Sequence, residues 1–141
     1  MSDTHVIETS WKGGLAFEAN INSHNVLMDA TEEFGGSNSG PSPKKLMLAA
    51  LSGCTGMDVV SILKKMQVEL DNLKIEVHGD VSEEHPKRYV KMHVIYIFYG
   101  KNLPLPKLEK AVKMSEETYC GVRAAYAPSM ELSSEIRIIE N

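Results

Sequence analysis

Cysteine, arginine and tryptophan are all scarce in this chain of 141 residues. It contains two cysteines and one tryptophan, and its only arginines are Arg88, Arg123 and Arg137. Two cysteines are too few for the disulfide framework that holds together many small secreted domains. The shortage of arginine and a formal net charge of −4 argue against nucleic-acid binding, since a phosphate backbone is bound by a basic surface.

The sequence also lacks a long apolar run and a basic leader. Its longest uncharged, largely apolar stretch covers residues 46–57, well short of the ~20 residues that a membrane span needs. The first residues lack the basic region of a secretory signal. We therefore expect a cytoplasmic protein that binds no membrane. Its composition, 43% hydrophobic and 24% charged, is that of a folded chain, and its length suits a single domain over residues 1–141.

Residues 1–30 are predicted to form short N-terminal strands. Apolar and polar residues alternate around the turn at Lys12-Gly13-Gly14, and a period of two indicates half-buried strands. The following segment, residues 29–41, is polar and rich in glycine, which predicts a mobile loop. No Gly-Lys-Ser/Thr sequence ends it, so a phosphate-binding loop is not expected there.

A long central helix is predicted over residues 42–66. Ser42 can cap it and Pro43 suits the first helical position. Between residues 46 and 63 every face is apolar or small except at Asp58, which predicts burial on all sides. One small domain cannot easily surround a helix of ~36 Å, and we therefore expect a dimer that shares this burial.

Residues 70–141 are predicted to form a hairpin, a second helix and a final strand. The hairpin turns at residues 83–87, the helix runs from Pro104 to Cys120, and the last strand covers residues 132–138. One stripe of the helix is expected to carry Leu105, Leu108, Val112 and Tyr119. This order of elements predicts an α+β fold, with helices on one side of antiparallel sheets.

Cys54 lies in a run of small residues within the apolar central helix, Ser52-Gly53-Cys54-Thr55-Gly56. A glycine inside a helix costs ~1 kcal/mol of helix stability relative to alanine, so a favourable interaction must offset the cost of Gly53 and Gly56. Close packing of another helix would do so. Space beside the sulfur for a substrate or a second thiol would do so equally, and both explanations stay open.

The chain resembles the OsmC/Ohr family, whose members are thiol-dependent peroxidases. The resemblance is carried by Gly-Pro-Ser-Pro-Lys-Lys-Leu-Met-Leu-Ala-Ala-Leu-Ser-Gly-Cys, which ends at Cys54, and by a second cysteine in Tyr119-Cys120-Gly121-Val122. It covers nearly the whole chain. The segment from Cys54 to Leu63 is most similar to the OsmC-like branch typified by YhfA.

This resemblance implies a function and an assembly. Cys54 would be the peroxidatic thiol, oxidised by an organic hydroperoxide to a sulfenic acid. Cys120 would resolve that acid to a disulfide, which an external dithiol would reduce. The family fold is an intertwined homodimer in which the long central helix is buried and the active sites lie at the subunit interface. No metal and no organic cofactor are implied.

The residues that activate the thiolate in this family depart from the usual pattern. A typical member uses an N-terminal arginine and a glutamate near the start of the helix. This chain has no arginine before Cys54, and the glutamate position falls at Lys44 or Lys45. Candidate cations are therefore Lys44 or Lys45 of the partner subunit, Lys12, and Arg123. Asp58 would raise the pKa of the thiol if it is ionised and close, or it is a buried hydrogen-bonding group.

Two alternative functions follow from these departures. In the first, the protein is a non-catalytic OsmC-like protein that binds a hydrophobic ligand in the dimer cleft. In the second, it is a redox sensor that cycles between the Cys54–Cys120 disulfide and two thiols. Met114 and Met130 could line an apolar pocket for an acyl tail. His78, His85 and His93 are not spaced like zinc ligands, and His78 and His93 are expected as solvent-facing neighbours across the hairpin.

Overall fold

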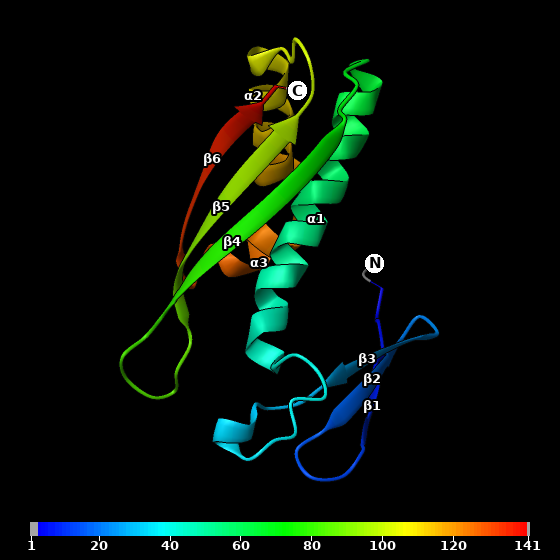
Figure 1. Cartoon of the computed structure of the whole chain (residues 1–141), viewed down its shortest axis with the longest axis vertical. Coiled ribbons are helices and arrows are strands. Elements are labelled where there is room, and N and C mark those ends of the chain that lie inside the picture. The colour runs from blue at the N-terminus through cyan, green and yellow to red at the C-terminus, as the bar shows by residue number, and fades with distance from the viewer. Residues whose placement is uncertain (1–2, 141) are drawn as a thin grey trace. The chain divides into compact units, whose positions relative to one another are not determined.

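The computed structural model describes residues 3–140, and the chain divides into two compact units, Met1–Met47 and Leu48–Asn141 (Figure 1). Each unit is described below by itself. The prediction that residues 1–141 form one domain therefore stays a prediction. The α+β fold class is confirmed, since the chain builds two three-stranded sheets together with its helices.

The N-terminal unit contains an antiparallel sheet in the order β1–β2–β3. Its strands are β1 (Glu8–Trp11), β2 (Phe17–Ile21) and β3 (His24–Met28). Positive φ angles at Gly13 (99°) and Gly14 (56°) form the turn between β1 and β2, a conformation that glycine adopts without steric cost. The predicted N-terminal strands are thus confirmed, although the chain buries only Ala19 among their apolar side chains.

The glycine-rich loop after β3 differs from the mobile segment predicted, because the side chain of Asp29 organises it. Asp29 accepts hydrogen bonds from the backbone N–H groups of Ala30 (2.7 Å), Ser37 (3.2 Å) and Ser39 (3.1 Å), and from the hydroxyl of Ser39 (2.6 Å). A short 3₁₀ helix, η1 (Glu32–Phe34), lies within the loop. These bonds hold the two ends of the loop together.

The central helix α1 spans Pro43–Lys65 and begins at the proline that the sequence places in its first turn. One face is buried, through side chains spaced four residues apart along the helix: Leu51, Thr55, Val59 and Leu63. Other faces are exposed in the single chain, with Met57 at 77%. The prediction of burial on all sides is therefore wrong for one chain by itself, because one sheet covers only one face of a helix.

Length and composition would also allow α1 to cross a membrane, and among residues 3–140 no other helix meets that description. Core helices of globular proteins share these properties. In the C-terminal unit α1 packs on a sheet, where a Cβ at Gly56 would lie 3.0 Å from the Ile75 side chain. Thr55 on its buried face is hydrogen-bonded to Tyr96. These contacts identify α1 as a helix of the protein core.

The C-terminal sheet has the order β4–β5–β6, formed by β4 (Asn72–Val81), β5 (Tyr89–Tyr99) and β6 (Glu131–Ile139). β4 and β5 form the predicted antiparallel hairpin, with His78 opposite His93. β6 runs parallel to β5, whereas antiparallel sheets were predicted. The chain leaves β5, passes through helices and returns in the same direction, as a crossover connection requires.

The helical connection contains α2 (Leu105–Met114), a π-helical turn η2 (Ser115–Tyr119) and a short helix α3 (Gly121–Tyr126) that was not predicted. Pro104 and Pro106 open α2 as expected. The N–H of Cys120 donates to the carbonyl of Ser115 (2.8 Å), and this wider turn changes the helical phase. Tyr119 is 58% exposed and Leu105 is 45% exposed, so only Leu108 and Val112 of the predicted stripe are buried, while Cys120 is buried as well.

Candidate functional site

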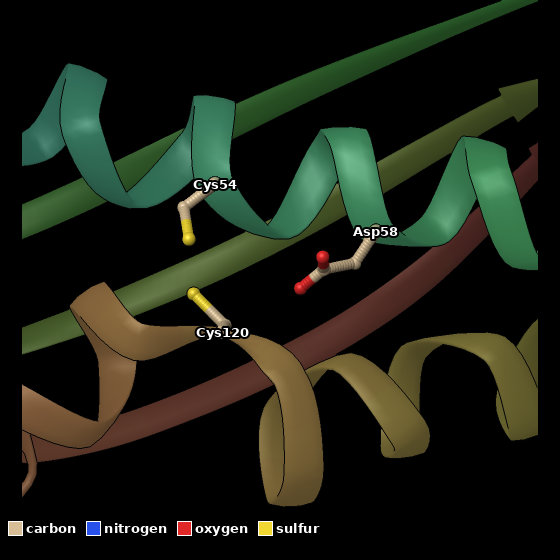
Figure 2. Close-up of side chains that lie close together, drawn as sticks. All are labelled: Cys54, Asp58 and Cys120. Atoms are coloured by element: carbon tan, nitrogen blue, oxygen red, sulfur yellow. The ribbon is translucent and has the colours of Figure 1, made fainter. Parts of the chain in front are cut away.

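Cys54 and Cys120 lie side by side in the C-terminal unit, although they are remote in the sequence (Figure 2). Cys54 comes from α1, and Cys120 comes from the junction between η2 and α3. Their sulfur atoms and a carboxylate oxygen of Asp58 all lie within 4.8 Å of one another. Both cysteines are free thiols. The structure therefore brings together the two predicted redox residues and one of the predicted neighbours.

The backbone around Cys120 fixes the position of its sulfur. The residue is the N-cap of α3, and its Sγ accepts a hydrogen bond from the backbone N–H of Arg123 (3.4 Å). The preceding π turn directs the side chain inward, so Cys120 is only 3% exposed. Cys54 is half-buried. Of the two sulfurs, that of Cys54 is thus the more accessible to a molecule from solvent.

Burial raises the pKa of the Cys120 thiol to about 11. The hydrogen bond from Arg123 acts against this shift, while the neighbouring Cys54 and the charge of Asp58 add to it. A thiol with such a pKa keeps its proton at neutral pH. Cys120 therefore carries a proton beside the Cys54 sulfur.

Three hydroxyl groups behind the thiols position Asp58. Ser115 Oγ donates to Asp58 Oδ2 (2.8 Å) and also lies 2.8 Å from Thr55 Oγ1. Thr55 Oγ1 in turn lies 2.8 Å from the Tyr96 hydroxyl. Thr55, Ser115 and Tyr96 are all buried. Polar groups in such an environment need hydrogen-bond partners. This series of hydrogen bonds therefore holds the Asp58 carboxylate and the side of α1 that carries Cys54 in place.

The network continues from Tyr96 to an ion pair. The Tyr96 hydroxyl donates to Glu116 Oε2 (3.2 Å), and Ser134 Oγ donates to Glu116 Oε1 (3.2 Å). The Arg123 guanidinium lies 3.7 Å from Glu116. Burial is the main reason why the pKa of Tyr96 is raised. Arg123, predicted as a cation beside the thiolate, thus directs its charge at Glu116 and contacts Cys120 through its backbone N–H.

The other predicted cations belong to the N-terminal unit. Lys44 and Lys45 are exposed in the first turn of α1. Lys12 forms a long ion pair with Glu18 (3.9 Å). Their place beside Cys54 in an assembled protein stays a prediction.

A cleft of about 460 Å³ opens beside Asp58. It has apolar walls for most of its extent, and its lining residues are Asp58, Ser61, Ile62, Lys65, Met66, Met114 and Tyr119. Met114 therefore lines an apolar pocket as the sequence analysis suggested, and Met66 lines it as well. The cleft can hold the apolar part of a small ligand while a polar group reaches Asp58.

The same three residues can hold a metal ion. Among residues 3–140, Cys54, Asp58 and Cys120 are the one group of three such side chains whose donor atoms converge. The histidines are engaged elsewhere: His93 is hydrogen-bonded to Ser133 and Glu135, and His78 to Glu76. His78 is exposed and His93 half-buried, which agrees with the expected pair across the hairpin.

Sequence reasoning missed four polar residues of this site, Thr55, Ser115, Tyr96 and Glu116. A signal existed for Thr55, because it lies four residues after Leu51 and four before Val59, on the buried face of α1. Ser115 and Glu116 belong to the π turn, which has no pattern in the sequence. Tyr96 lies on β5, and nothing in the sequence indicated what its hydroxyl would contact.

The chain is similar to known proteins over most of its length. The family model for OsmC-like proteins matches residues 36–135. Protein YhfA of Escherichia coli K12 is 27% identical over 130 residues, which cover 92% of this chain and 94% of YhfA. A hypothetical protein from Aquifex aeolicus VF5 has a solved structure with a TM-score of 0.87 and 29% identity, covering 99% of both chains.

The fold is also that of an organic hydroperoxide resistance protein OsmC from Legionella pneumophila. That structure superposes with a TM-score of 0.71 over 96% of this chain and 99% of its own length. The sequence identity is 13%, so the similarity concerns the fold. The two proteins therefore share a fold although few of their residues are identical.

Proposed function

Because the chain belongs to the family of OsmC-like proteins, we propose that it is a thiol-dependent peroxidase that reduces organic hydroperoxides. Cys54 is the peroxidatic residue and Cys120 the resolving residue. The observation that carries this proposal is the convergence of the two sulfurs within 4.8 Å. A pair at this separation needs only modest side-chain movement to form a disulfide, whose Cβ atoms lie ~4 Å apart.

Exposure supports the assignment of the two roles. The peroxide must reach the first nucleophile, and Cys54 is the more exposed sulfur. Cys120 needs to meet only the oxidised Cys54. Because Cys120 keeps its proton at neutral pH, it is suited to react second, after Cys54 has been oxidised.

The reaction then has three balanced steps. The Cys54 thiolate attacks one peroxide oxygen, the O–O bond breaks, and the alcohol leaves with a proton while Cys54 becomes a sulfenic acid. Cys120 sulfur attacks the Cys54 sulfur, an S–S bond forms, and the hydroxyl leaves as water with the Cys120 proton. An external dithiol finally reduces the disulfide and is itself oxidised to a disulfide. Asp58 is the carboxylate beside both sulfurs and can accept and return the proton.

The apolar cleft beside Asp58 supports an organic substrate. Its walls include Ile62, Met66 and Met114, which would contact a hydrocarbon tail. Methionine side chains adapt to tails of varied shape. Hydrogen peroxide has no tail and would gain nothing from these contacts, so we expect a preference for hydroperoxides of organic or fatty-acid origin.

A homodimer and a cytoplasmic location complete the proposal. α1 leaves an apolar groove of about 630 Å³, whose walls include Gly53, Met57, Val60 and Ile75. An exposed apolar surface of this kind favours association, and a second copy would supply Lys44 or Lys45 as the missing cation. A reducing cytoplasm would keep both thiols available between turnovers.

Stopped-flow measurement of peroxide consumption tests the enzyme proposal. Cys54→Ser should abolish turnover of an organic hydroperoxide in the presence of a dithiol. Without dithiol, Cys120→Ser should still consume about one equivalent of hydroperoxide and accumulate a sulfenic acid at Cys54, because a free dithiol would itself reduce that acid. Ser52→Ala is a matched control on α1, since Ser52 bonds only to the carbonyl of Ala49 in its own helix. Equal rates for the wild type and Cys54→Ser would exclude the proposal.

The same cleft favours one alternative function, in which the protein binds a hydrophobic ligand without catalysis. A ligand binder would retain a fatty acid in both the wild type and Cys54→Ser, and neither would consume peroxide. A redox sensor would form the Cys54–Cys120 disulfide once and would not turn over with dithiol. The number of peroxide equivalents consumed per subunit therefore separates the three functions: none for the binder, one for the sensor and many for the peroxidase.

A further inference from the structure

The thiol site proposed for peroxide reduction also brings three metal-donor atoms to one point. Two sulfurs and one carboxylate oxygen converge within 4.8 Å at Cys54, Cys120 and Asp58. We propose that the reduced protein binds one Zn²⁺ ion through these three side chains. This inference does not rest on the proposed peroxidase activity, since it requires only the reduced thiols and the carboxylate.

The separation of the donors suits one tetrahedral ion. With Zn–S bonds of ~2.3 Å and a Zn–O bond of ~2.1 Å, donors on one tetrahedral zinc ion lie about 3.6–3.8 Å apart. The donors here lie within 4.8 Å of one another, so movements of about 1 Å or less by side-chain rotation close the site. All three face the same point between α1 and the η2–α3 junction (Figure 2).

Surrounding groups already orient two of the three ligands. Ser115 Oγ donates to Asp58 Oδ2 and leaves the other carboxylate oxygen available. The backbone N–H of Arg123 donates to Cys120 Sγ. Hydrogen bonds of this kind hold metal ligands in place and are a regular part of metal sites. A chance meeting of two thiols and a carboxylate would not need both supports.

The donor types favour zinc over the harder cations. Thiolates select Zn²⁺ and similar soft ions, whereas Mg²⁺ and Ca²⁺ prefer oxygen ligands throughout. With three protein ligands, the fourth position is open on the side of the cleft that Asp58 lines. Water would occupy that position.

Binding is a ligand exchange without electron transfer. Zn²⁺ replaces the protons of Cys54 and Cys120, two Zn–S bonds form, and two protons pass to solvent. Zinc and a Cys54–Cys120 disulfide therefore exclude each other. Zinc-loaded protein should resist thiol oxidation, and oxidised protein should release zinc.

The test is a titration of the reduced, metal-free full-length protein with Zn²⁺ against a chromophoric chelator. We expect one ion per chain. Cys54→Ser and Cys120→Ser should each weaken affinity by about 100-fold or more, and Asp58→Asn by about 10- to 100-fold, since even outer-shell changes cost this much. Asp80→Asn, at an exposed aspartate on β4, is the matched control and should bind as the wild type does.

Cobalt substitution gives a second measurement that needs no variant. Co²⁺ bound to the wild type should show thiolate-to-cobalt charge transfer and the intense visible bands of a tetrahedral site. Wild-type affinity no higher than that of the Cys54→Ser/Cys120→Ser double variant, or six-coordinate cobalt, would overturn the proposal. A failure of peroxide turnover would leave these results unchanged, so the two proposals fail separately.

Discussion

The sheets β1–β2–β3 and β4–β5–β6 each have three strands, but the chain covers them to very different extents. Within the C-terminal sheet, β5 alone buries seven side chains: Tyr89, Met92, Val94, Ile95, Tyr96, Ile97 and Phe98. Large apolar side chains of the N-terminal unit stay exposed in the single chain: Val6, Ile7, Trp11, Leu15, Phe17, Ile21 and Phe34. Several exposed apolar side chains in one small unit favour association with another protein surface.

The two units of this short chain also differ in the groups that they contain. The C-terminal unit holds both cysteines, the hydroxyl network and most of the core. The N-terminal unit offers apolar side chains that its own strands do not cover, as expected of a segment that becomes buried in an intertwined dimer. We expect the C-terminal unit to carry the chemistry and the N-terminal sheet to add to the association surface at the α1 groove, and the following substitutions test that division.

The largest effect is expected from comparing two phenylalanines on the two sheets. Phe98 on β5 is fully buried, whereas Phe17 on β2 is 42% exposed. Phe98→Ala should lower the free energy of unfolding by about 3–5 kcal/mol, because it removes core contacts and leaves a cavity. Phe17→Ala should cost less than about 1 kcal/mol in protein dilute enough to be monomeric.

Urea unfolding at low and high protein concentration measures both costs. If a second copy covers the N-terminal sheet, the cost of Phe17→Ala should rise with concentration and that of Phe98→Ala should not. Equal costs for the two variants in dilute protein would mean that one chain covers both sheets by itself.

An intermediate effect is expected at Thr55, whose hydroxyl lies between Ser115 and Tyr96. Thr55→Val keeps the size of the side chain but removes a partner from two buried hydroxyl groups, which should cost about 1–3 kcal/mol. Thr9→Val, on the exposed strand β1, should change stability by less than about 0.5 kcal/mol. Thermal unfolding of both variants provides the comparison, and a neutral Thr55→Val would show that the network adds no stability.

The smallest effect is expected at Asp29, the buried carboxylate of the N-terminal unit. Its pKa is lowered to about 2, first of all by the hydroxyl of Ser39 and then by backbone N–H groups. Because the folded value lies below the ordinary 3.8, the stabilisation is complete above about pH 4 and disappears as the pH falls to about 2.

Asp29→Asn is the variant that isolates this effect. The stability difference between the wild type and Asp29→Asn should therefore shrink over this pH range, as followed by urea unfolding at successive pH values. A difference that does not depend on pH would show that the charge of Asp29 does not hold the loop.

Much of the local structure could be predicted from the sequence. Pro43 marks the start of α1, Pro104 and Pro106 open α2, and alternating residues predict β4 and β5 with His78 opposite His93. These features depend on residues that are close in the chain, so a local pattern suffices to detect them.

Three features could not be predicted in the same way. The π turn displaces Tyr119 from its expected stripe, β6 lies parallel to β5, and Asp58 is bound by Ser115. Each depends on how the helical crossover returns across the sheet, and no short sequence pattern records that path.

The sequence alone therefore indicated which residues to propose for the chemistry, a cysteine among small residues on a long apolar helix and a second cysteine at the end of a later helix. Only the tertiary structure decided that Cys54, Asp58 and Cys120 meet within 4.8 Å. It also showed that Arg123 directs its charge at Glu116. Helical and strand periodicity arise from neighbours in the chain, whereas the distance between remote side chains is set by the packing of α1 and the η2–α3 junction on one sheet.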